Sequence, residues 1–556
     1  MKIISLLIVT IFSINVYGQS WQWAKPTTGG NKYNGCFPSN LRTDKSGDLY
    51  VGNFFVGDSI SFGNYTLHTA GPLEFDTIHD NYMSIVTKYD SLGNVKWTNG
   101  NSWGSCSQFD IATDPAGNVY ELITTYGDSV RFNDLYLPAT YYDSVWFADF
   151  PSYLIKYNSN GSITWIKSIG QITIYGTTSL ASVRTDNAGN IYIYAAFYDP
   201  STVIGPYPIS KVSVGLSAFI AKLDSDGNFL WIKQFDNSAV GYLGMTISSN
   251  NDIFLIGEDP LVIKMDTGGN TLSTIEKIAT VAPVCVTTDK DGNLYVGGEI
   301  LLQPGYTCKI GTYSFTTPFN ADFVYAGILI KYNSSNEIEY VRCLLPGKED
   351  SSSNYQTNYI GSVATDSCDN VWITGPIDPE SGIWLDPSTI IYAPQKNSLP
   401  LFLAEYDDAG NLLDHQIIPN GQNSITNCTG LAIDDRNNIY LGGPISINPF
   451  ALGNDVVSTS DIAQYFVAKY DPQIPCGIST LNNGSDIIIF PNPTTASLTI
   501  IATHTISNVS IVDMLGQVLY SIDTNSEKIE LNINWLANGM YFLRINHAEV
   551  RKFVKI

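Results

Sequence analysis

Positive charge is scarce in this chain. Its 556 residues contain 29 Lys and Arg against 52 Asp and Glu, for a formal net charge of −23. Nucleic-acid binding needs clustered basic side chains, and no long basic run occurs, so the composition argues against a nucleic-acid partner. The acidic excess is typical of a well-solvated surface.

Residues that bind metals or act as nucleophiles are also few. The chain has five His and eight Cys, and no two Cys stand in a Cys-x-x-Cys spacing. A zinc site is therefore unsupported. No G-x-S-x-G, H-E-x-x-H or P-loop motif occurs either. We expect no cofactor and no resident metal, and we identify no catalytic residue.

Long apolar runs are missing beyond the N-terminus. No later segment has about 18 uninterrupted apolar residues, so we expect no membrane-spanning segment. Residues 1–18 have the features of a secretory signal peptide, with a positive start at Lys2, an apolar stretch at 3–12 and a small-residue cleavage site at 16–18. The chain is therefore expected to be exported.

Repetition, by contrast, is abundant. The phrase T-D-x-x-G-N-x-Y recurs in exact or looser copies that begin at residues 43, 113, 185, 247, 288, 365 and 433. Repetition of this kind predicts one architecture multiplied along the chain, not several unrelated domains.

A second phrase follows most copies of the first. Its fullest form, K-Y-D-x-x-G-N-x-x-W, stands at 88–97. Short runs rich in β-branched and aromatic residues flank these Gly-Asn turns, a pattern typical of strands joined by tight hairpins. In one unit, the pattern predicts strands at 109–113, 119–125, 153–157 and 163–169. Four-stranded antiparallel units, repeated seven times, predict an all-β fold that contains a seven-bladed β-propeller.

The ends of the array predict how it closes. The seventh unit has a third strand at 465–470 but no fourth strand after it. Near the N-terminus, Trp23-Ala24-Lys25 matches Trp-Ile-Lys at 165–167 and 231–233. We therefore predict that an N-terminal strand completes the last blade and hides its edge. The fourth unit is short, and its outer loop is missing.

The repeats resemble bacterial SBBP-type β-propeller repeats in both phrases, over roughly residues 21–470. The resemblance implies the fold and does not identify a ligand. Cys36 and Cys106 each precede a repeat phrase by seven residues, which makes them one candidate disulfide pair.

The C-terminal segment has a different pattern. F-P-N-P-T-T-A-S-L-T-I stands at 490–500, S-I-V-D-M-L-G-Q-V-L-Y at 510–520 and L-A-N-G-M-Y-F-L-R-I at 536–545, before a final K-F-V-K-I. Alternating apolar residues predict a small β-sandwich. The residues expected on its buried face are Leu498, Ile500, Val509, Ile511, Val518 and Tyr520.

In order and spacing, these phrases resemble the C-terminal sorting domain of the type IX secretion system of Bacteroidetes-type bacteria. The resemblance implies that the chain passes through the periplasm to the outer cell surface or the medium, and that the secretion machinery is a partner. The sorting motif residues are Pro491, Asn492, Pro493, Gly516, Gly539 and Tyr541. The predicted organisation is a signal peptide at 1–18, a propeller at 19–470, a linker at 471–486 and the sorting domain at 487–556.

Candidate ligand-binding residues lie in a long insertion of the second unit. They are aromatic side chains suited to stacking on sugar rings or anchoring a protein, namely Tyr141, Tyr142, Trp146, Phe147 and Phe150. Local packing of the loop is the alternative. Segment 72–82 carries metal-capable side chains that we interpret as solvated loop charge. The D-x-D-G-N turns at 224–228 and 289–293 resemble the start of a calcium loop but lack its distal Glu, so we interpret them as hairpin turns.

These features favour a non-enzymatic, exported module that binds surface glycan or extracellular protein, as in adhesion. An extracellular polysaccharide-acting hydrolase or lyase is the alternative, because paired catalytic carboxylates have no sequence spacing to detect. A purely structural surface protein is a third possibility.

The tail generates a test of export. A chain truncated before Ile487 should stay in the periplasm of the native host, while the full chain reaches the surface or the medium, as measured by fractionation and immunoblotting. Equal surface levels of the two chains would contradict the sorting role.

Overall fold

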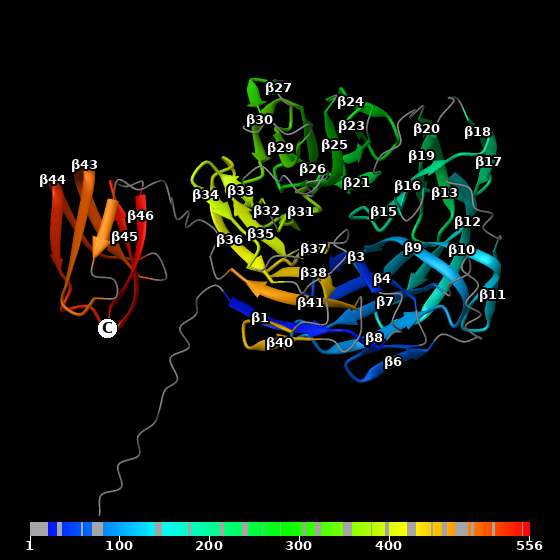
Figure 1. Ribbon diagram of the computed structural model, residues 1–556, viewed down its shortest axis with the longest axis horizontal. Coiled ribbons are helices and arrows are strands. Elements are labelled where there is room, and N and C mark those ends of the chain that lie inside the picture. Colours follow the sequence, from blue (N-terminus) through cyan, green and yellow to red (C-terminus); the bar gives the residue numbers. More distant parts are fainter. Residues whose placement is uncertain are drawn as a thin grey trace, which may run out of the picture.

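The computed structural model is built from β-strands throughout the part of the chain that it describes (Figure 1). The described residues are 20–29, 36–56, 59–68, 82–139, 147–175, 178–179, 181–211, 216–235, 243–257, 259–278, 280–303, 307–316, 324–347, 358–379, 381–394, 400–419, 430–445, 449–458, 464–472, 487–490, 494–513, 517–546 and 549–555. The expected signal peptide lies outside them. No helix long and apolar enough to cross a membrane occurs within these ranges.

The described residues between 20 and 471 form consecutive antiparallel sheets, numbered here 1 to 7 in chain order; six of them have four strands, and sheet 2 has two short strands in addition to its four long ones. Sheet 1 contains β3 (Cys36–Thr43), β4 (Leu49–Val56), β7 (Tyr82–Tyr89) and β8 (Val95–Gly100). Sheet 2 contains β9 (Trp103–Thr113), β10 (Val119–Phe132), β12 (Phe147–Tyr157) and β13 (Ile163–Tyr175). Sheet 3 contains β15 (Ala181–Thr185), β16 (Ile191–Phe197), β19 (Ser217–Leu223) and β20 (Phe229–Phe235). Sheet 4 contains β21 (Gly244–Ile247), β22 (Ile253–Ile256), β23 (Val262–Met265) and β24 (Thr271–Ile275).

Sheet 5 contains β25 (Val281–Thr288), β26 (Leu294–Leu302), β29 (Val324–Tyr332) and β30 (Ile338–Leu344). Sheet 6 contains β31 (Ser362–Thr365), β32 (Val371–Pro376), β35 (Leu401–Tyr406) and β36 (Leu412–Ile418). Sheet 7 contains β37 (Gly430–Ile433), β38 (Ile439–Ile445), β41 (Gln464–Asp471) and, from the N-terminus, β1 (Ser20–Pro26).

Short strands decorate the links between second and third strands. They are β5 (Ser59–Phe62) with β6 (Tyr65–His68), β11 (Leu135–Pro138), β17 (Ser201–Ile204) with β18 (Tyr207–Ser210), β27 (Thr307–Ile310) with β28 (Tyr313–Thr316), β33 (Ile383–Asp386) with β34 (Thr389–Ile391), and β39 (Phe450–Leu452) with β40 (Asp455–Val457). β2 (Thr28–Gly29), which follows β1, pairs with β5. A further short strand, β14 (Thr178–Ser179), pairs with β13. Sheet 4 passes from Ile256 to Val262 with only a tight link, as its sequence predicts.

The first strands of the sheets make the array propeller-like. Each contacts the next in chain order, and β37 contacts β3 again, with these strands toward the middle in Figure 1. Threonine hydroxyls of the repeat phrase link neighbouring first strands. Thr113 donates to the Thr43 carbonyl at 3.2 Å, and Thr43 donates to the Ile433 carbonyl at 2.9 Å. The chain's first and last repeat units are therefore directly bonded.

The predicted N-terminal strand is confirmed as the fourth strand of sheet 7. β1 pairs antiparallel with β41, with Trp23 opposite Lys469 and Ala24 opposite Ala468. Trp23 and Ala24 are both buried in the cores that flank this sheet.

The first Asp of the repeat phrase caps its own turn. In sheet 2, Asp114 Oδ1 accepts the backbone N–H groups of Ala116 and Asn118 at 2.9 Å. Its Oδ2 accepts the Asn118 amide at 2.7 Å and the Tyr120 hydroxyl at 3.0 Å. Gly117 supplies the positive φ, +77°, that the turn requires. The same first-turn cap recurs at Asp44, Asp186, Asp289, Asp366 and Asp434.

A tryptophan then joins each of several sheets to the next. Trp97 of sheet 1 lies on Gly161 of sheet 2, and its Nε1 donates to the Ser159 carbonyl at 3.1 Å. A Cβ at Gly161 would meet the indole at 2.6 Å, so glycine is needed for this approach. The other tryptophan–glycine contacts are Trp23 with Gly93, Trp165 with Gly227 and Trp231 with Gly269. The second phrase is therefore an interlock between consecutive sheets.

Two expectations about this region need correction. The strands of the second unit extend well beyond the predicted bounds, because pairing continues through polar residues such as Ser152, whose buried hydroxyl donates to the Phe150 carbonyl. The candidate Cys36–Cys106 disulfide is wrong. Cys106 is a free, buried thiol that donates to the Asn101 side-chain oxygen at 3.2 Å.

The C-terminal segment forms a separate five-stranded sheet. Its strands are β42 (Ile487–Phe490), β43 (Ser497–Val512), β44 (Val518–Asn532), β45 (Gly539–Ile545) and β46 (Glu549–Lys555). Leu498, Ile500, Val509 and Ile511 are buried as predicted. Val518 and Tyr520 are 52% and 37% exposed, contrary to prediction, because β44 pairs only with β43 and lies at an edge.

The interlock generates a matched stability test. Gly161→Ala should lower stability by about 2–5 kcal/mol, through the cost of a positive φ in alanine and the clash with Trp97. Gly189 has nearly the same φ, +80° against +84°, with no atom within 4 Å of an added Cβ. Gly189→Ala should therefore cost only about 1–2 kcal/mol. Equal losses in melting temperature would show that the indole contact is not the constraint.

Candidate functional site

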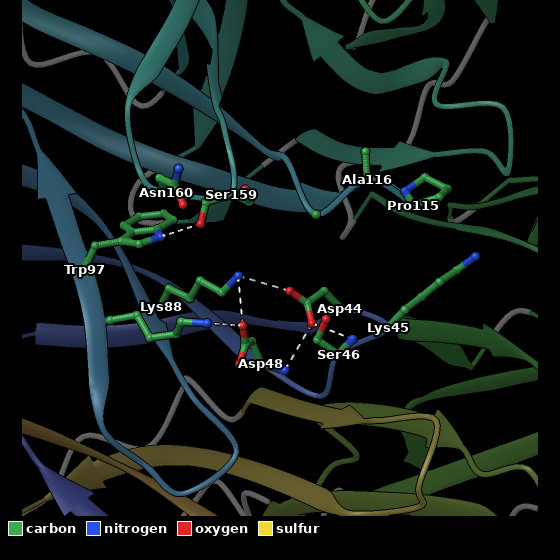
Figure 2. Close-up of a pocket in the computed structure, with 12 residues that line it drawn as sticks. Asp44, Lys45, Ser46, Asp48, Lys88, Trp97, Pro115, Ala116, Ser159 and Asn160 are labelled. Atoms are coloured by element: carbon green, nitrogen blue, oxygen red, sulfur yellow. Dashed lines mark hydrogen bonds and ion pairs between the residues drawn. The ribbon is translucent and has the colours of Figure 1, made fainter.

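A pocket of about 460 Å³ opens between the turns of sheets 1 and 2 (Figure 2). One side comes from the first turn of sheet 1, with Asp44, Lys45, Ser46 and Asp48, and the opposite side from two turns of sheet 2. Its remaining lining residues are Lys88, Lys96, Trp97, Pro115, Ala116, Gly117, Ser159 and Asn160.

At four other junctions a lysine occupies the equivalent place, whereas Lys264 of sheet 4 pairs with Asp252 of its own sheet at 3.0 Å. The third-strand lysine of the second phrase reaches the following sheet and donates to a carbonyl of its second turn. We call this bond the lysine latch. It joins Lys156 to Ser225 at 2.9 Å, Lys222 to Thr267 at 3.1 Å, Lys331 to Asp408 at 3.0 Å and Lys469 to Ser91 at 3.2 Å. The equivalent bond between sheets 1 and 2 would join Lys88 to Ser159.

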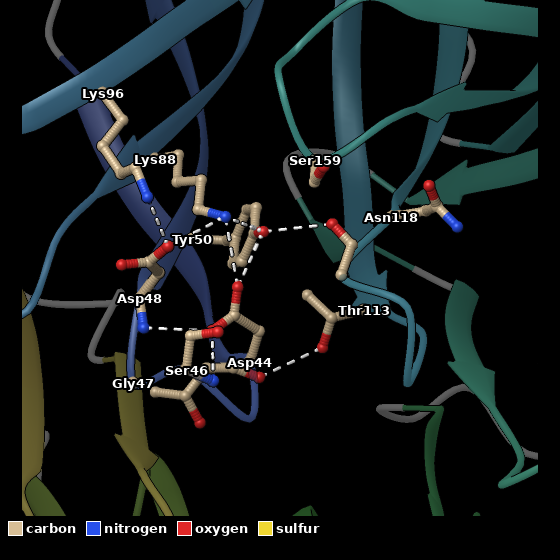
Figure 3. Close-up of polar contacts among 12 residues, drawn as sticks. Asp44, Ser46, Gly47, Asp48, Tyr50, Lys88, Lys96, Thr113, Asn118 and Ser159 are labelled. Atoms are coloured by element: carbon tan, nitrogen blue, oxygen red, sulfur yellow. Dashed lines mark hydrogen bonds and ion pairs between the residues drawn. The ribbon is translucent and has the colours of Figure 1, made fainter.

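Lys88 turns back into its own sheet instead (Figure 3). Its Nζ lies 3.1 Å from Asp44 Oδ2 and 3.0 Å from Asp48 Oδ2, and 4.5 Å from the centre of the Tyr50 ring. The lysine is 3% exposed, so these contacts are made out of water. The Ser159 carbonyl keeps its bond from Trp97, and the space that a latch would fill is left as the pocket.

The cause is a single change in the repeat phrase. Five of the seven copies place Asn at the sixth position of the phrase, and its amide donates to the capping carboxylate, as Asn190 does to Asp186 at 2.8 Å. Sheet 1 has Asp48 there, which would face Asp44 with like charge. Lys88 between the two carboxylates, with Lys96 at 2.9 Å from Asp48, offsets that repulsion. The cap is thus kept, and the latch is lost.

The charges of the site are mutually stabilised. Partial burial tends to raise the pKa of Asp44, but the Lys88 ammonium and the donors of the turn outweigh it and lower the pKa below its ordinary value. The hydrogen bond to Asp48 raises the pKa of Lys96. Both groups are therefore ionised at neutral pH.

The pocket presents paired donors and acceptors on a narrow rim. Lys96 is half-exposed, with a side chain 47% accessible, and offers its ammonium beside the Asp48 carboxylate. Ser46 and Asn160 are exposed on facing turns, and Trp97 forms an apolar wall. Alternating charged donors and acceptors over a rigid backbone suit a polyhydroxylated ligand, whose hydroxyls can donate and accept.

The structure describes only some of the predicted ligand-binding aromatic residues. Tyr141, Tyr142 and Trp146 lie outside the described residues, and Phe147 is placed only by its backbone, as the first residue of β12. Phe150 is 2% exposed and its ring lies 4.9 Å from that of Tyr126, so it packs inside its own sheet. Their role in binding stays a prediction.

The other predicted sites are partly described. Pro491, Asn492, Pro493 and Gly516 of the sorting motif lie outside the described residues, as does most of segment 72–82. Gly539 begins β45, and Tyr541 stacks on Phe553 and donates to the Ala537 carbonyl at 3.0 Å. Within the described ranges, no three His, Cys, Asp or Glu side chains gather as a metal site.

Sequence reasoning missed Asp48 and Lys88. The signal was present, because the copy at 43–50 reads Gly-Asp where the copies at 113, 185 and 288 read Gly-Asn. Its meaning depends on the lysine latch, which joins residues of different sheets and so has no sequence spacing of its own.

Sheet 6 departs from the repeat in the opposite way. Glu405 stands on its third strand where most sister sheets carry the lysine, and it is 1% exposed. Asn370 donates to its Oε1 at 2.8 Å, while Oε2 is buried without a hydrogen-bond partner. Burial, with repulsion from Asp366 and Asp414, raises the pKa of Glu405 to about 8.

This raised pKa predicts a pH dependence of stability. The folded chain holds a proton that the unfolded chain releases near pH 4.5, so stability falls as pH rises from about 4.5 to about 8, by up to about 1.4 kcal/mol per unit. Glu405→Gln removes this titration. The variant should melt progressively higher than the wild type as pH is raised from 5 to 8 in calorimetry. A constant difference across that range would contradict the assignment.

Comparison with known proteins identifies the C-terminal domain. Residues 488–556 match the secretion system C-terminal sorting domain family. An uncharacterised WD repeat-containing protein of Acanthamoeba polyphaga mimivirus is 31% identical over 115 residues, which span 19% of this chain and 8% of that protein's length.

Two solved structures are similar at low identity. A streptogramin B lyase is 10% identical, with a TM-score of 0.37, over 81% of this chain and 98% of that one. PorZ, a surface component of the type IX secretion system of Porphyromonas gingivalis, is 10% identical, with a TM-score of 0.16, over 96% of this chain and all of that one.

The family match covers the same strands that carry the tail phrases, β42 to β46. The chain therefore carries a type IX secretion C-terminal sorting domain and is delivered to the cell surface or the extracellular space.

Proposed function

We propose that this protein is an exported, non-enzymatic glycan-binding module, and that its sheets 1 to 7 form a seven-bladed β-propeller closed by β1. The sorting domain, proposed to be a small β-sandwich, engages the type IX secretion machinery and places the propeller outside the cell. The pocket between sheets 1 and 2 is the proposed ligand site.

The loss of the lysine latch carries this proposal. Neighbouring junctions use their lysine to tie two sheets together, whereas Asp48 withdraws Lys88 and leaves polar groups facing an open space. A missing latch sacrifices stability at this junction. A local loss of stability is expected at a functional site, where residues are selected for binding and not for packing between sheets.

The charged side chains of the pocket suit glycan binding better than glycan hydrolysis or elimination. Asp44 receives the Lys88 ammonium and backbone N–H donors, which lower its pKa and favour its ionised form. Asp48 lies against the ammonium groups of Lys88 and Lys96. A general acid would instead need a carboxyl that stays protonated near neutral pH. The two carboxylates are therefore proposed to accept hydrogen bonds from ligand hydroxyls, and Lys45 and Lys96 to donate them.

The substitution Asp48→Asn tests the site directly. It restores the usual phrase and should release Lys88 to latch onto Ser159, which closes the pocket. In a glycan-array screen followed by calorimetry with the best ligand, affinity should fall at least tenfold, about 1.4 kcal/mol. The melting temperature should stay the same or rise.

The matched control is Asp226→Asn, which makes the same charge change at an exposed turn residue of sheet 3. It should leave affinity unchanged. Equal affinity in the Asp48→Asn variant would remove the pocket from the proposal and leave the aromatic insertion around Trp146 as the candidate surface, tested by Trp146→Ala. New reducing ends or unsaturated sugars in the incubated glycan would instead establish the polysaccharide-acting enzyme.

A further inference from the structure

A second unusual cluster lies on the first strands of sheets 1, 2 and 3. The position before the first residue of the repeat phrase is small in five copies, with Ala112, Thr246, Thr287, Ala364 and Ala432. The other two copies carry Arg42 and Arg184. Their strands, β3 and β15, flank β9 near the middle of the array (Figure 1).

Both guanidinium groups converge on one buried carboxylate. Arg42 Nη2 donates to Asp110 Oδ1 at 2.8 Å, and Arg184 Nη1 donates to Asp110 Oδ2. Asp110 also accepts the Ser182 hydroxyl at 2.9 Å and the Val183 N–H at 3.1 Å. Its side chain is only 5% exposed. The carboxylate is thus saturated with donors and neutralises one of two positive charges.

The excess charge has no counterpart among the described contacts. Arg42 Nε is buried without a hydrogen-bond partner. Arg184 uses Nη1 alone, toward Asp110 and the Val183 carbonyl, so the parallel Nε and Nη2 donors are not engaged by any described residue. The two arginine side chains remain 23% and 26% exposed, so a small group can reach them.

The electrostatics of Arg42 and Arg184 also favour a bound anion. Burial and the neighbouring Arg184 lower the pKa of Arg42 to about 10, against the opposing effect of Asp110. Two like charges held together out of water are stabilised by an anion placed between them.

We propose that Arg42 and Arg184 form an oxyanion-binding site in the centre of the array, for a carboxylate or sulfate group. The Nε and Nη2 edge of Arg184 supplies a bidentate pair, which matches both groups in geometry. Arg42 adds a second positive charge beside that pair. This site is independent of the pocket between sheets 1 and 2, which lies at the turns.

Calorimetry on the full chain tests the site with three probes at constant ionic strength. Sodium sulfate or D-glucuronate should bind, and D-glucose should not. The tighter of the two anions identifies the source as a sulfate ester or a uronate. Failure of both anions to bind the wild type would overturn the proposal.

Arg184→Gln should weaken anion binding at least tenfold. The control is Arg342→Gln, which alters a partly buried arginine at the junction of sheets 5 and 6 that donates to the Gly410 carbonyl. It should leave affinity unchanged.

If Arg184→Gln alone lowers the melting temperature strongly, the double variant Asp110→Asn, Arg184→Gln removes one charge of each sign and should fold. It should show the same loss of anion binding. Unchanged affinity in the folded variant would contradict the assignment.

Discussion

The array depends on side chains that leave one sheet and end in a turn of the next. A tryptophan lies on the glycine of the following turn, and a lysine donates to a carbonyl of the same turn. At two junctions both donors meet on one carbonyl: Trp231 and Lys222 donate to that of Thr267, and Trp23 and Lys469 donate to that of Ser91. These junctions are tied by packing and by hydrogen bonds together. Neighbouring sheets cannot slide without breaking these contacts, and β1 extends them from sheet 7 to sheet 1 through Trp23.

The same contacts explain which features of the fold could be predicted from the sequence. The all-β class, the four-stranded unit, the contribution of β1 to sheet 7 and the sorting tail all follow from local phrases, because each turn carries its own cap and glycine. Strand ends away from the turns were missed, since pairing continues through buried polar residues such as Ser152. Edge exposure of Val518 and Tyr520 was missed because alternation alone does not say which strand lacks a neighbour.

The candidate site was unpredictable for a related reason. The Asp at position 48, where most copies have Asn, is visible in the sequence. Its effect, however, is to hold Lys88 away from the Ser159 carbonyl, which lies in another sheet, 71 residues after Lys88. Functional features in a repeat protein of this kind lie where one copy departs from its sisters. Glu405 and the two arginines at 42 and 184 are such departures, and Asp48 is another, shared with Asp252 of sheet 4.

The position of the Lys88 ammonium tests this account most directly. A crystal structure of the full chain should place Nζ between the carboxylates of Asp44 and Asp48, as here, with the Ser159 carbonyl bonded only by Trp97 and the pocket open. A Lys88 extended onto the Ser159 carbonyl, with the pocket filled, would contradict the claim that this junction lacks its latch.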